Sequence, residues 1–286
     1  MSRLLNTFEL NACLKDTNTR VIDCRFSLAD PDYGLNAYQK SHIPGAVYLD
    51  LDKDLSAKVV PGLTGRHPLP HPQEFAEKLG KLGISDQHTI VIYDDADGAK
   101  AARLWWMLLW LGKSEGVYLL DGGYQAWVND GLPCTSVLPE NPLTHFDFVC
   151  NDSLKVEANE VLSSLSAEQV IVLDARAYSR FAGEEEPIDS VAGHIPGAVC
   201  CPYTENLDQN TKFKFPSELL ERFRHLGVNE VTNCICYCGS GVTACHNIFS
   251  MQLAGLPMPK LYVGSWSEWI TSPQRPVSKL DAMISD

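Results

Sequence analysis

The sequence predicts an α/β protein made of two similar halves, each a parallel sheet with helices on both faces. Two observations carry this prediction: a pentapeptide that occurs twice, and short apolar runs that alternate with helical stretches. The pentapeptide HIPGA stands at residues 42–46 and again at residues 194–198. Alternating strands and helices are typical of parallel sheets, because the helix that connects two parallel strands covers a face of the sheet.

Further landmarks keep the same order in both halves. An apolar run ends in Asp23 before the first HIPGA and in Asp174 before the second. The other shared landmarks are a strand-like run and a closing segment of glycine and aromatic residues, at 89–93 and 123–127 in the first half and at 234–237 and 264–269 in the second. Such a shared order indicates a tandem duplication.

The elements of each half follow from local pattern. The runs at 89–93 (TIVIY), 170–173 (VIVL) and 234–237 (CICY) are β-prone and do not alternate between polar and apolar residues. This pattern suits strands that are buried on both faces of a parallel sheet. Residues 72–82 and 216–226 are helical stretches that end near a glycine. We therefore expect each half to run strand, loop, strand, helix, strand, turn and helix.

The length of 286 residues fits two domains. We expect an N-terminal domain at 1–133, a linker at 134–154 and a C-terminal domain at 155–286, because prolines and weak periodicity mark the stretch between the halves. Arg25 and Arg176 directly follow the strand ends, and we expect them to pair locally and to serve structure.

The charge balance excludes some classes of partner. Lys and Arg total 23 against 36 for Asp and Glu, a net charge of −13, whereas nucleic acids and anionic membranes select a basic surface. The longest strongly apolar run, at 104–111, is far shorter than the roughly 20 residues of a membrane span. The first 20 residues lack an apolar signal core, and ten cysteines are too few for a disulfide scaffold. We expect a cytoplasmic protein with mostly reduced cysteines and no nucleic-acid or membrane partner.

Residues 238–244 (CGSGVTA) are the candidate chemical loop. They follow the strand-like run at 234–237 and lead into a helical run at 245–253. A glycine-containing loop between strand and helix can turn its backbone N–H groups inward, and the helix N-terminus adds positive potential. An anion or a thiolate at Cys238 would be stabilised there. An ordinary strand-to-helix turn with an unreactive cysteine is the structural alternative.

Three other chemistries fit this loop less well. A cysteine phosphatase needs an arginine about six positions after the cysteine to hold phosphate oxygens, but Ala244 stands there. The nearby cysteines lack the paired CxxC spacing of zinc sites, and a dithiol redox pair would need CxxC as well. We therefore expect no metal ion and no organic cofactor.

The two HIPGA segments, with CGSGVTACH in the second half only, resemble the two-domain rhodanese family of sulfurtransferases. The loop is most similar to that of the 3-mercaptopyruvate sulfurtransferase branch. The resemblance covers nearly the whole chain and includes RLWW at 103–106, LDGG at 120–123 and GSW at 264–266. It implies tandem rhodanese-like domains, each with a five-stranded parallel sheet, and an active site between them. It also implies that Cys238 accepts a sulfane sulfur and passes it on.

The resemblance implies a single active site. Asp94 is the residue of the first half that corresponds to Cys238. A carboxylate cannot carry sulfur, so the N-terminal domain is expected to be catalytically inactive.

Around Cys238, a proton relay is expected from Ser240, His42 and an acidic partner. The resemblance places His42 near the cleft between the domains, with the acidic residue some ten positions upstream. Asp32 has that spacing, and Asp30 is close enough to keep the choice open. A Ser–His–Asp relay is physically reasonable, because the histidine can shuttle a proton once the aspartate fixes its tautomer. For His42 the alternative is that HIPGA only shapes a turn.

Arg180 matches the family's substrate-anchoring arginine, and mercaptopyruvate carries a carboxylate that it could hold. One residue departs from the family pattern: a second arginine usually stands in a Glu-Pro-Arg segment, but here Ile188 takes its place. Arg66 or Arg103 could substitute for it. The loop residues expected to bind substrate together with Arg180 are Gly239, Gly241, Val242 and Thr243.

The expected activity is transfer of sulfur from 3-mercaptopyruvate through a Cys238 persulfide to cyanide, a thiol or a thioredoxin-like reductant. Thiosulfate is the alternative donor. Rhodaneses that use it carry Arg and Lys directly after the cysteine, whereas this chain has the uncharged Gly239 and Ser240. The alternatives outside enzymatic turnover are a persulfide carrier loaded by another protein and a scaffold module.

Overall fold

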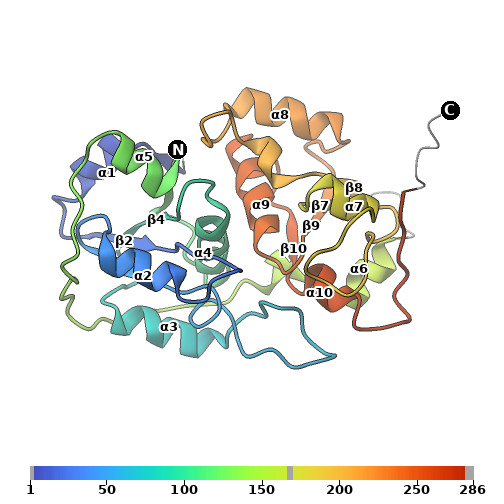
Figure 1. Ribbon diagram of the computed structural model, residues 1–286, viewed down its shortest axis with the longest axis horizontal. Coiled ribbons are helices and arrows are strands. Elements are labelled where there is room, and N and C mark those ends of the chain that lie inside the picture. The colour runs from blue at the N-terminus through green and yellow to red at the C-terminus, as the bar shows by residue number, and fades with distance from the viewer. Residues whose placement is uncertain (1–2, 166–169, 281–286) are drawn as a thin grey trace. The chain divides into compact units, whose positions relative to one another are not determined.

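The computed structural model describes residues 3–165 and 170–280, which form two compact units. Each unit contains one five-stranded parallel sheet flanked by helices (Figure 1). Each unit also includes a segment from the other half of the chain: unit 1 is Met1–Lys58, Leu69–Asp152 and Leu207–Phe213, and unit 2 is Val59–Pro68, Ser153–Asn206 and Lys214–Asp286. The predicted fold class and the five strands of each sheet are confirmed.

The two sheets have the same topology. In unit 1 the order across the sheet is β1 (Leu4–Leu5), β5 (Val117–Leu120), β4 (Thr89–Tyr93), β2 (Thr19–Asp23) and β3 (Ala46–Tyr48). In unit 2 the order is β6 (Lys155–Val156), β10 (Lys260–Tyr262), β9 (Asn233–Tyr237), β7 (Val170–Asp174) and β8 (Val199–Cys200). The registers correspond as well, since Asp23 pairs with Tyr93 and Asp174 pairs with Tyr237.

Helices connect the strands. Those of the first half are α1 (Thr7–Cys13), α2 (Tyr33–Lys40), α3 (Pro72–Lys81), α4 (Ala99–Trp110) and α5 (Gly123–Asn129). Those of the second half are α6 (Ala158–Ser164), α7 (Tyr178–Ala182), α8 (Pro216–His225), α9 (Thr243–Leu253) and α10 (Ser265–Trp269), with 3-10 turns at η1 (Asp152–Leu154) and η2 (Tyr203–Asn206). The stretch from 136 to 151 contains no helix or strand.

The pattern predicts a loop between the strand that ends in Asp23 and the first HIPGA, and likewise between the strand that ends in Asp174 and the second HIPGA. This prediction is wrong, because α2 lies between β2 and β3 and α7 lies between β7 and β8. Both helices are short, with eight and five residues. Each buries one aromatic side chain, Tyr38 on α2 and Phe181 on α7. A single buried turn gives too little periodicity to predict a helix from sequence.

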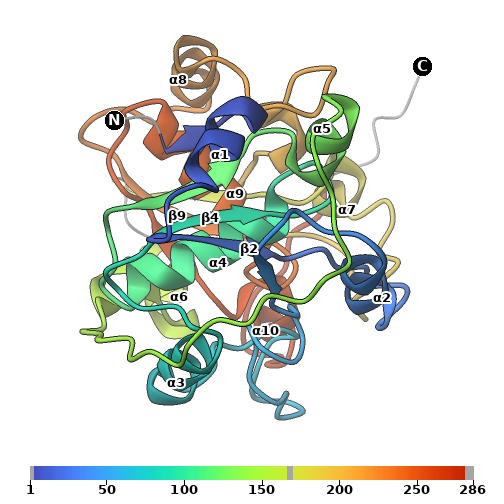
Figure 2. The same cartoon turned by 90° about the vertical axis from the view of Figure 1, so that its left-hand side faces the viewer.

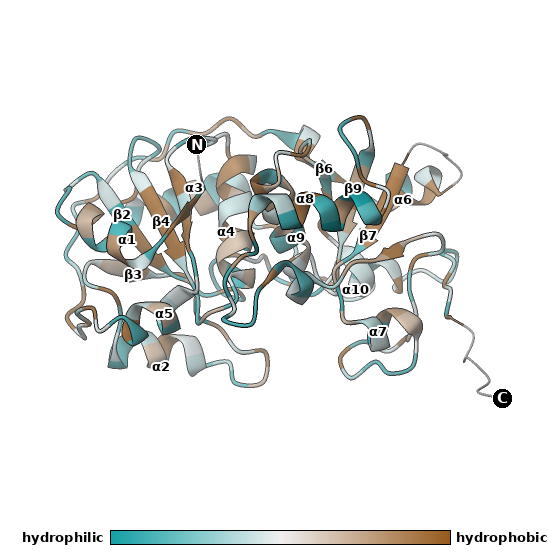
Figure 3. Ribbon diagram, turned by 90° about the horizontal axis from the view of Figure 1, so that it is seen from above, coloured by the Kyte–Doolittle hydropathy of each residue, from teal (hydrophilic) through white to brown (hydrophobic). Residues whose placement is uncertain are grey.

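The apolar run of the first half forms most of α4, which packs on β4 and β5 (Figure 2). Nearly all of its side chains are buried, which explains why the run shows no polar face. The middle of strand β4 is strongly apolar, as Figure 3 shows in brown. Among the described residues, no helix combines the length and the hydropathy that a membrane crossing requires.

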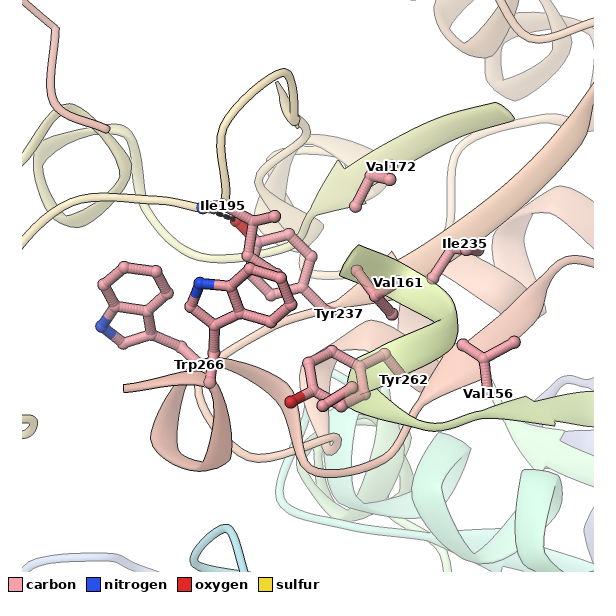
Figure 4. Close-up of a cluster of buried hydrophobic side chains, with 10 residues drawn as sticks. Val156, Val161, Val172, Ile195, Ile235, Tyr237, Tyr262 and Trp266 are labelled. Carbon is pink, nitrogen blue, oxygen red and sulfur yellow. Dashed lines mark hydrogen bonds between the residues drawn. The ribbon is translucent and has the colours of Figure 1, made fainter. Parts of the chain in front are cut away.

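The core of unit 2 supports the end of β9, where the candidate loop begins. Ile195 from the second HIPGA donates its backbone N–H to the hydroxyl of Tyr237 at 3.2 Å. Figure 4 shows this contact inside an apolar cluster. The labelled members of the cluster are Val156, Val161, Val172, Ile195, Ile235, Tyr237, Tyr262 and Trp266. Tyr237 directly precedes Cys238, so the core fixes the start of the loop.

Two buried ion pairs confirm the local role expected for the strand-end arginines. Arg25 binds Asp23 at 2.6 Å, and Arg176 binds Asp174 at 2.7 Å. In each pair the arginine also donates its own backbone N–H to the aspartate. Hydrogen bonding of this kind is what allows charged groups to remain in a core.

Candidate active site

Cys238 lies in the loop that joins β9 to α9. Its side chain is almost fully buried, with 2% exposed. The backbone N–H of Gly241 donates to the Cys238 Sγ at 3.2 Å. Gly241 has a φ of +76°, a conformation that favours glycine. The loop thus presents a backbone donor to the thiol, as predicted from its glycines.

The first turn of α10 holds the backbone of Cys238. The Cys238 N–H donates to Ser265 Oγ at 3.1 Å, and the Trp266 N–H donates to the Cys238 carbonyl at 2.9 Å. Ser267 adds a third bond from its N–H to the Gly239 carbonyl at 2.9 Å. Ser265 has a φ of +54°, which is unusual for a residue other than glycine. This strained position places its hydroxyl between Cys238 and the Tyr262 carbonyl.

The histidine that contacts Ser240 is His67. Its Nδ1 lies 2.7 Å from Ser240 Oγ, and both side chains are buried, with 4% and 7% exposed. His67 belongs to Val59–Pro68, the segment of the first half that is part of unit 2. Ser240 and a histidine are therefore brought together as expected, but by a different histidine.

The prediction that His42 forms the relay is wrong. His42 is fully buried in unit 1, with Nδ1 2.7 Å from the Tyr38 carbonyl and its ring stacked on that tyrosine. His194 repeats the arrangement in the second HIPGA, with Nδ1 2.7 Å from the Phe181 carbonyl. The histidine of HIPGA thus fastens a turn to the preceding helix in both halves. Asp32 is exposed at the start of α2, Asp30 accepts the N–H of Asp32, and neither carboxylate bonds to His42.

Arg180 lies beside the loop within a cluster of charged side chains. It donates to both oxygens of Glu186, from Nε at 3.1 Å and from Nη2 at 2.6 Å. It also binds Asp189 at 3.1 Å, and Arg66 binds the other oxygen of the same carboxylate. Asp189 therefore lies between Arg66 and Arg180, and Glu186 lies between Arg180 and Arg176, which binds it at 3.3 Å.

Burial and pairing set the protonation of these carboxyls. Burial opposes ionisation of Glu186, but hydrogen bonds from Arg180 and from the backbone outweigh it and lower the pKa of Glu186. Burial raises the pKa of Asp189, and the charge of Arg66 opposes that rise. Ionised Glu186 holds the Arg180 guanidinium in a fixed orientation.

Gly239 provides the space that these arginines need. A methyl group on Gly239 would lie 2.8 Å from Arg66 Nη2 and 3.6 Å from Arg180 Nη1. The other expected loop residues, Val242 and Thr243, are the N-terminal cap and the first residue of α9.

Of the two candidates for the missing second arginine, Arg66 lies at the loop. Arg103 is fully buried in α4 of unit 1. Ile188 is 44% exposed, and its backbone N–H donates to Glu186.

Sequence reasoning missed His67, Asp189 and the two serines of α10, Ser265 and Ser267. His67 stands in an irregular segment of prolines and glycines, where no periodicity or repeat marks it. Among the described residues, no group of three or more His, Cys, Asp or Glu side chains could hold a metal ion.

The arrangement combines a buried thiol, a hydroxyl–imidazole pair and two guanidinium groups. A thiol that receives an N–H bond can act as a nucleophile once deprotonated. A serine hydroxyl bonded to imidazole can move a proton. Guanidinium groups bind carboxylates and other oxyanions through paired hydrogen bonds.

Comparison with known proteins agrees with this chemistry. The model of the rhodanese-like domain matches residues 8–130 and 157–272, once in each half of the chain. A Pseudomonas aeruginosa protein named "Probable 3-mercaptopyruvate sulfurtransferase" is 51% identical over 98% of this chain and 99% of its own length. The 3-mercaptopyruvate sulfurtransferase of Mus musculus is 38% identical over 81% of this chain and 78% of its own length.

Solved structures show the same fold. The crystal structure of SseA from Escherichia coli, reported under the rhodanese fold of 3-mercaptopyruvate sulfotransferases, superposes with a TM-score of 0.82 at 32% identity. The match covers 94% of this chain and all of SseA.

Proposed function

Because this chain belongs to the rhodanese family, we propose that it is a sulfurtransferase that takes sulfane sulfur from 3-mercaptopyruvate onto Cys238. The observation that carries the proposal is the position of Cys238. Its thiol receives the Gly241 N–H and lies in the same loop as the Ser240–His67 pair. The arginines beside Gly239 suit a donor that carries a carboxylate.

The first half-reaction loads the enzyme. The Cys238 thiolate attacks the sulfur of 3-mercaptopyruvate and forms an S–S bond. The C–S bond of the donor breaks, and its electron pair passes to the carbon fragment, which leaves as the enolate of pyruvate. One proton converts this enolate to pyruvate, and the Ser240–His67 pair is placed to manage that proton.

The second half-reaction unloads it. A nucleophile such as cyanide attacks the outer sulfur of the Cys238 persulfide and leaves as thiocyanate, and the thiolate is regenerated. A small thiol or a thioredoxin-like reductant in the cytoplasm would accept the same sulfur. Every step uses side chains of this protein alone, without a metal or an organic cofactor.

Thiosulfate is the second candidate donor. The uncharged loop does not favour this dianion, but the two arginines beside Gly239 do. They supply cationic groups that the uncharged loop lacks. However, Glu186 and Asp189 balance both charges, so a dianion would meet no excess positive charge. This balance favours the monocarboxylate donor.

The test is thiocyanate formation with cyanide, with kcat/KM measured for both donors. We expect at least a tenfold preference for 3-mercaptopyruvate, and a preference for thiosulfate would overturn the donor assignment. Cys238→Ser should remove both turnover and the gain of one sulfur, about 32 Da, seen by mass spectrometry. Cys134→Ser, at an exposed cysteine, is the control and should keep both. Loading without turnover would identify a persulfide carrier, and absence of loading would identify a scaffold.

A further inference from the structure

Two guanidinium groups of unit 2 converge on the residue after Cys238. Arg66 and Arg180 come from segments far apart in sequence, yet both lie within 3.6 Å of the Cβ position of Gly239. We infer that Arg66 is the second carboxylate anchor of the site and sets its specificity for donors with a carboxylate. This inference rests on the proposed function. It assigns to Arg66 the role of the second arginine of the family pattern, whose position Ile188 occupies in this chain.

Each of the two arginines has a guanidinium nitrogen near Gly239 that these ion pairs do not use. Arg180 uses Nε and Nη2 on Glu186 and Asp189, which leaves Nη1, one of the two atoms 3.6 Å from that Cβ position. Arg66 uses Nη1 on Asp189, which leaves Nη2 at 2.8 Å. Its Nε is buried and has no hydrogen-bond partner among the described residues. An incoming carboxylate would satisfy donors that the protein itself leaves open.

The position of Arg66 is fixed by the same turn of α10 that holds Cys238. Its backbone N–H donates to Ser267 Oγ at 3.0 Å, and the Ser267 N–H donates to the Gly239 carbonyl. The preceding Gly65 fits closely, since a methyl group there would lie 2.4 Å from the Gly264 carbonyl oxygen. Arg66 is therefore held by its backbone through Ser267 and by its side chain through Asp189.

Charge indicates which ligands the pair accepts. Arg66 and Arg180 are balanced by Glu186 and Asp189, so the site offers directed donors without net positive charge. Such a site gains from a planar monocarboxylate that can take paired hydrogen bonds, more than from a compact dianion. Donors of this class are α-keto thiols and other small thiols with a carboxylate.

Kinetics gives the first test. Arg66→Gln should raise KM for 3-mercaptopyruvate about 10- to 100-fold, because bonds to a charged group are lost. The release of sulfur from preloaded Cys238 to cyanide should stay within about twofold. Arg66→Lys should restore part of the loss, because it keeps the charge without the paired geometry. The control is Arg224→Gln, at an exposed arginine that pairs with Glu230. An unchanged KM in Arg66→Gln would overturn the inference.

Alkylation gives a second readout that does not depend on turnover. Iodoacetate and iodoacetamide deliver similar carbon centres to Cys238, one with a carboxylate and one neutral. The ratio of the two rates, followed on the Cys238 peptide by mass spectrometry, should fall about tenfold in Arg66→Gln while the iodoacetamide rate stays the same. A ratio that does not move overturns the inference, whatever happens to KM.

The two proposals fail separately. If Cys238 carries no sulfur but its alkylation prefers iodoacetate in an Arg66-dependent way, the carboxylate anchor stands and the proposed reaction does not. If 3-mercaptopyruvate turns over normally and neither readout depends on Arg66, the reaction stands and the anchor does not.

Discussion

Asp94 and Cys238 hold the same position in the two halves of the chain. Each directly follows a tyrosine at the end of a strand, and that tyrosine pairs with a buried aspartate on the neighbouring strand. Both side chains are buried in a loop that leads into a helix. One position thus carries a carboxylate in unit 1 and a thiol in unit 2.

The loop of Asp94 binds its own carboxylate. Asp94 accepts the N–H groups of Gly98 at 2.9 Å, Lys100 at 2.9 Å and Ala101 at 3.2 Å. These are donors of the kind that bind anions at the start of a helix. The loop of the first half thus binds a carboxylate of the protein itself.

Asp94 should make stability depend on pH. Burial, followed by the charge of Asp97, raises the pKa of Asp94 to about 6 from 3.8. The native state then holds a proton more tightly than the unfolded chain, so this group lowers the free energy of unfolding as pH rises from about 4 to above 6. The total is about 3 kcal/mol at most. Asp94→Asn should flatten this part of the profile, measured by urea unfolding from pH 4 to 7.5. Asp147→Asn, at a side chain 82% exposed, should leave the profile unchanged; parallel profiles for the wild type and Asp94→Asn would contradict the prediction.

His67 and His42 should separate activity from stability. His67→Gln removes the imidazole next to Ser240 and should lower kcat at least tenfold. His42→Gln removes a buried ring bonded to the Tyr38 carbonyl and should cost about 1–3 kcal/mol of stability, with kcat within about twofold. Steady-state kinetics and thermal unfolding of both variants are the measurement. A loss of kcat in His42→Gln alone would restore the relay expected from the sequence.

Gly241 should matter for both backbone and chemistry. Its φ is +76°, so Gly241→Ala should cost about 1–2 kcal/mol and should displace the N–H that reaches Cys238 Sγ. Gly197→Ala is a matched control, since its φ is +75° and a methyl group there would meet no atom within 4 Å. We expect similar losses of stability, and a kcat/KM at least tenfold lower for Gly241→Ala only. Equal kcat/KM in the two variants would mean that the N–H bond to the sulfur has no catalytic role.

The adjacent Cys200 and Cys201 should stay unreactive in the folded protein. Burial raises the pKa of Cys200 to about 12 and that of Cys201 to about 11, so neither forms appreciable thiolate at neutral pH. After incubation with donor, added sulfur should appear on the Cys238 peptide and not on the peptide with 200 and 201. Cys200→Ser should keep kcat/KM within about twofold. Sulfur found on Cys200 would reveal a second carrier.

The central strands of both sheets could be predicted from the sequence, because the same strand pattern occurs in each half. The strand at 89–93 and its counterpart at 233–237 support one another, and the helices Pro72–Lys81 and Pro216–His225 begin and end close to the predicted residues. The candidate loop at 238–244 was also recognisable, because its cysteine and glycines stand close together in the sequence.

The assignment of histidines could not be made from sequence. His42 belongs to a repeated motif, which made it a candidate for the site. In both halves, however, the histidine of this motif bonds to a backbone carbonyl of the preceding helix. His67 contacts Ser240, which is 173 positions away in the sequence, and it stands in an irregular segment. Contacts of that kind depend on tertiary packing and leave no local pattern. Asp189 could not be predicted for the same reason, because its role depends on its position between Arg66 and Arg180.

The exchange of Val59–Pro68 between the halves limits how modular the duplicated chain can be. If a gene were divided at the linker, the product with Cys238 would lack both Arg66 and His67. The half without Cys238 therefore encodes two side chains that the structure places beside the loop of Cys238. One half carries Cys238 and the other carries Arg66 and His67, so the two halves are interdependent rather than redundant.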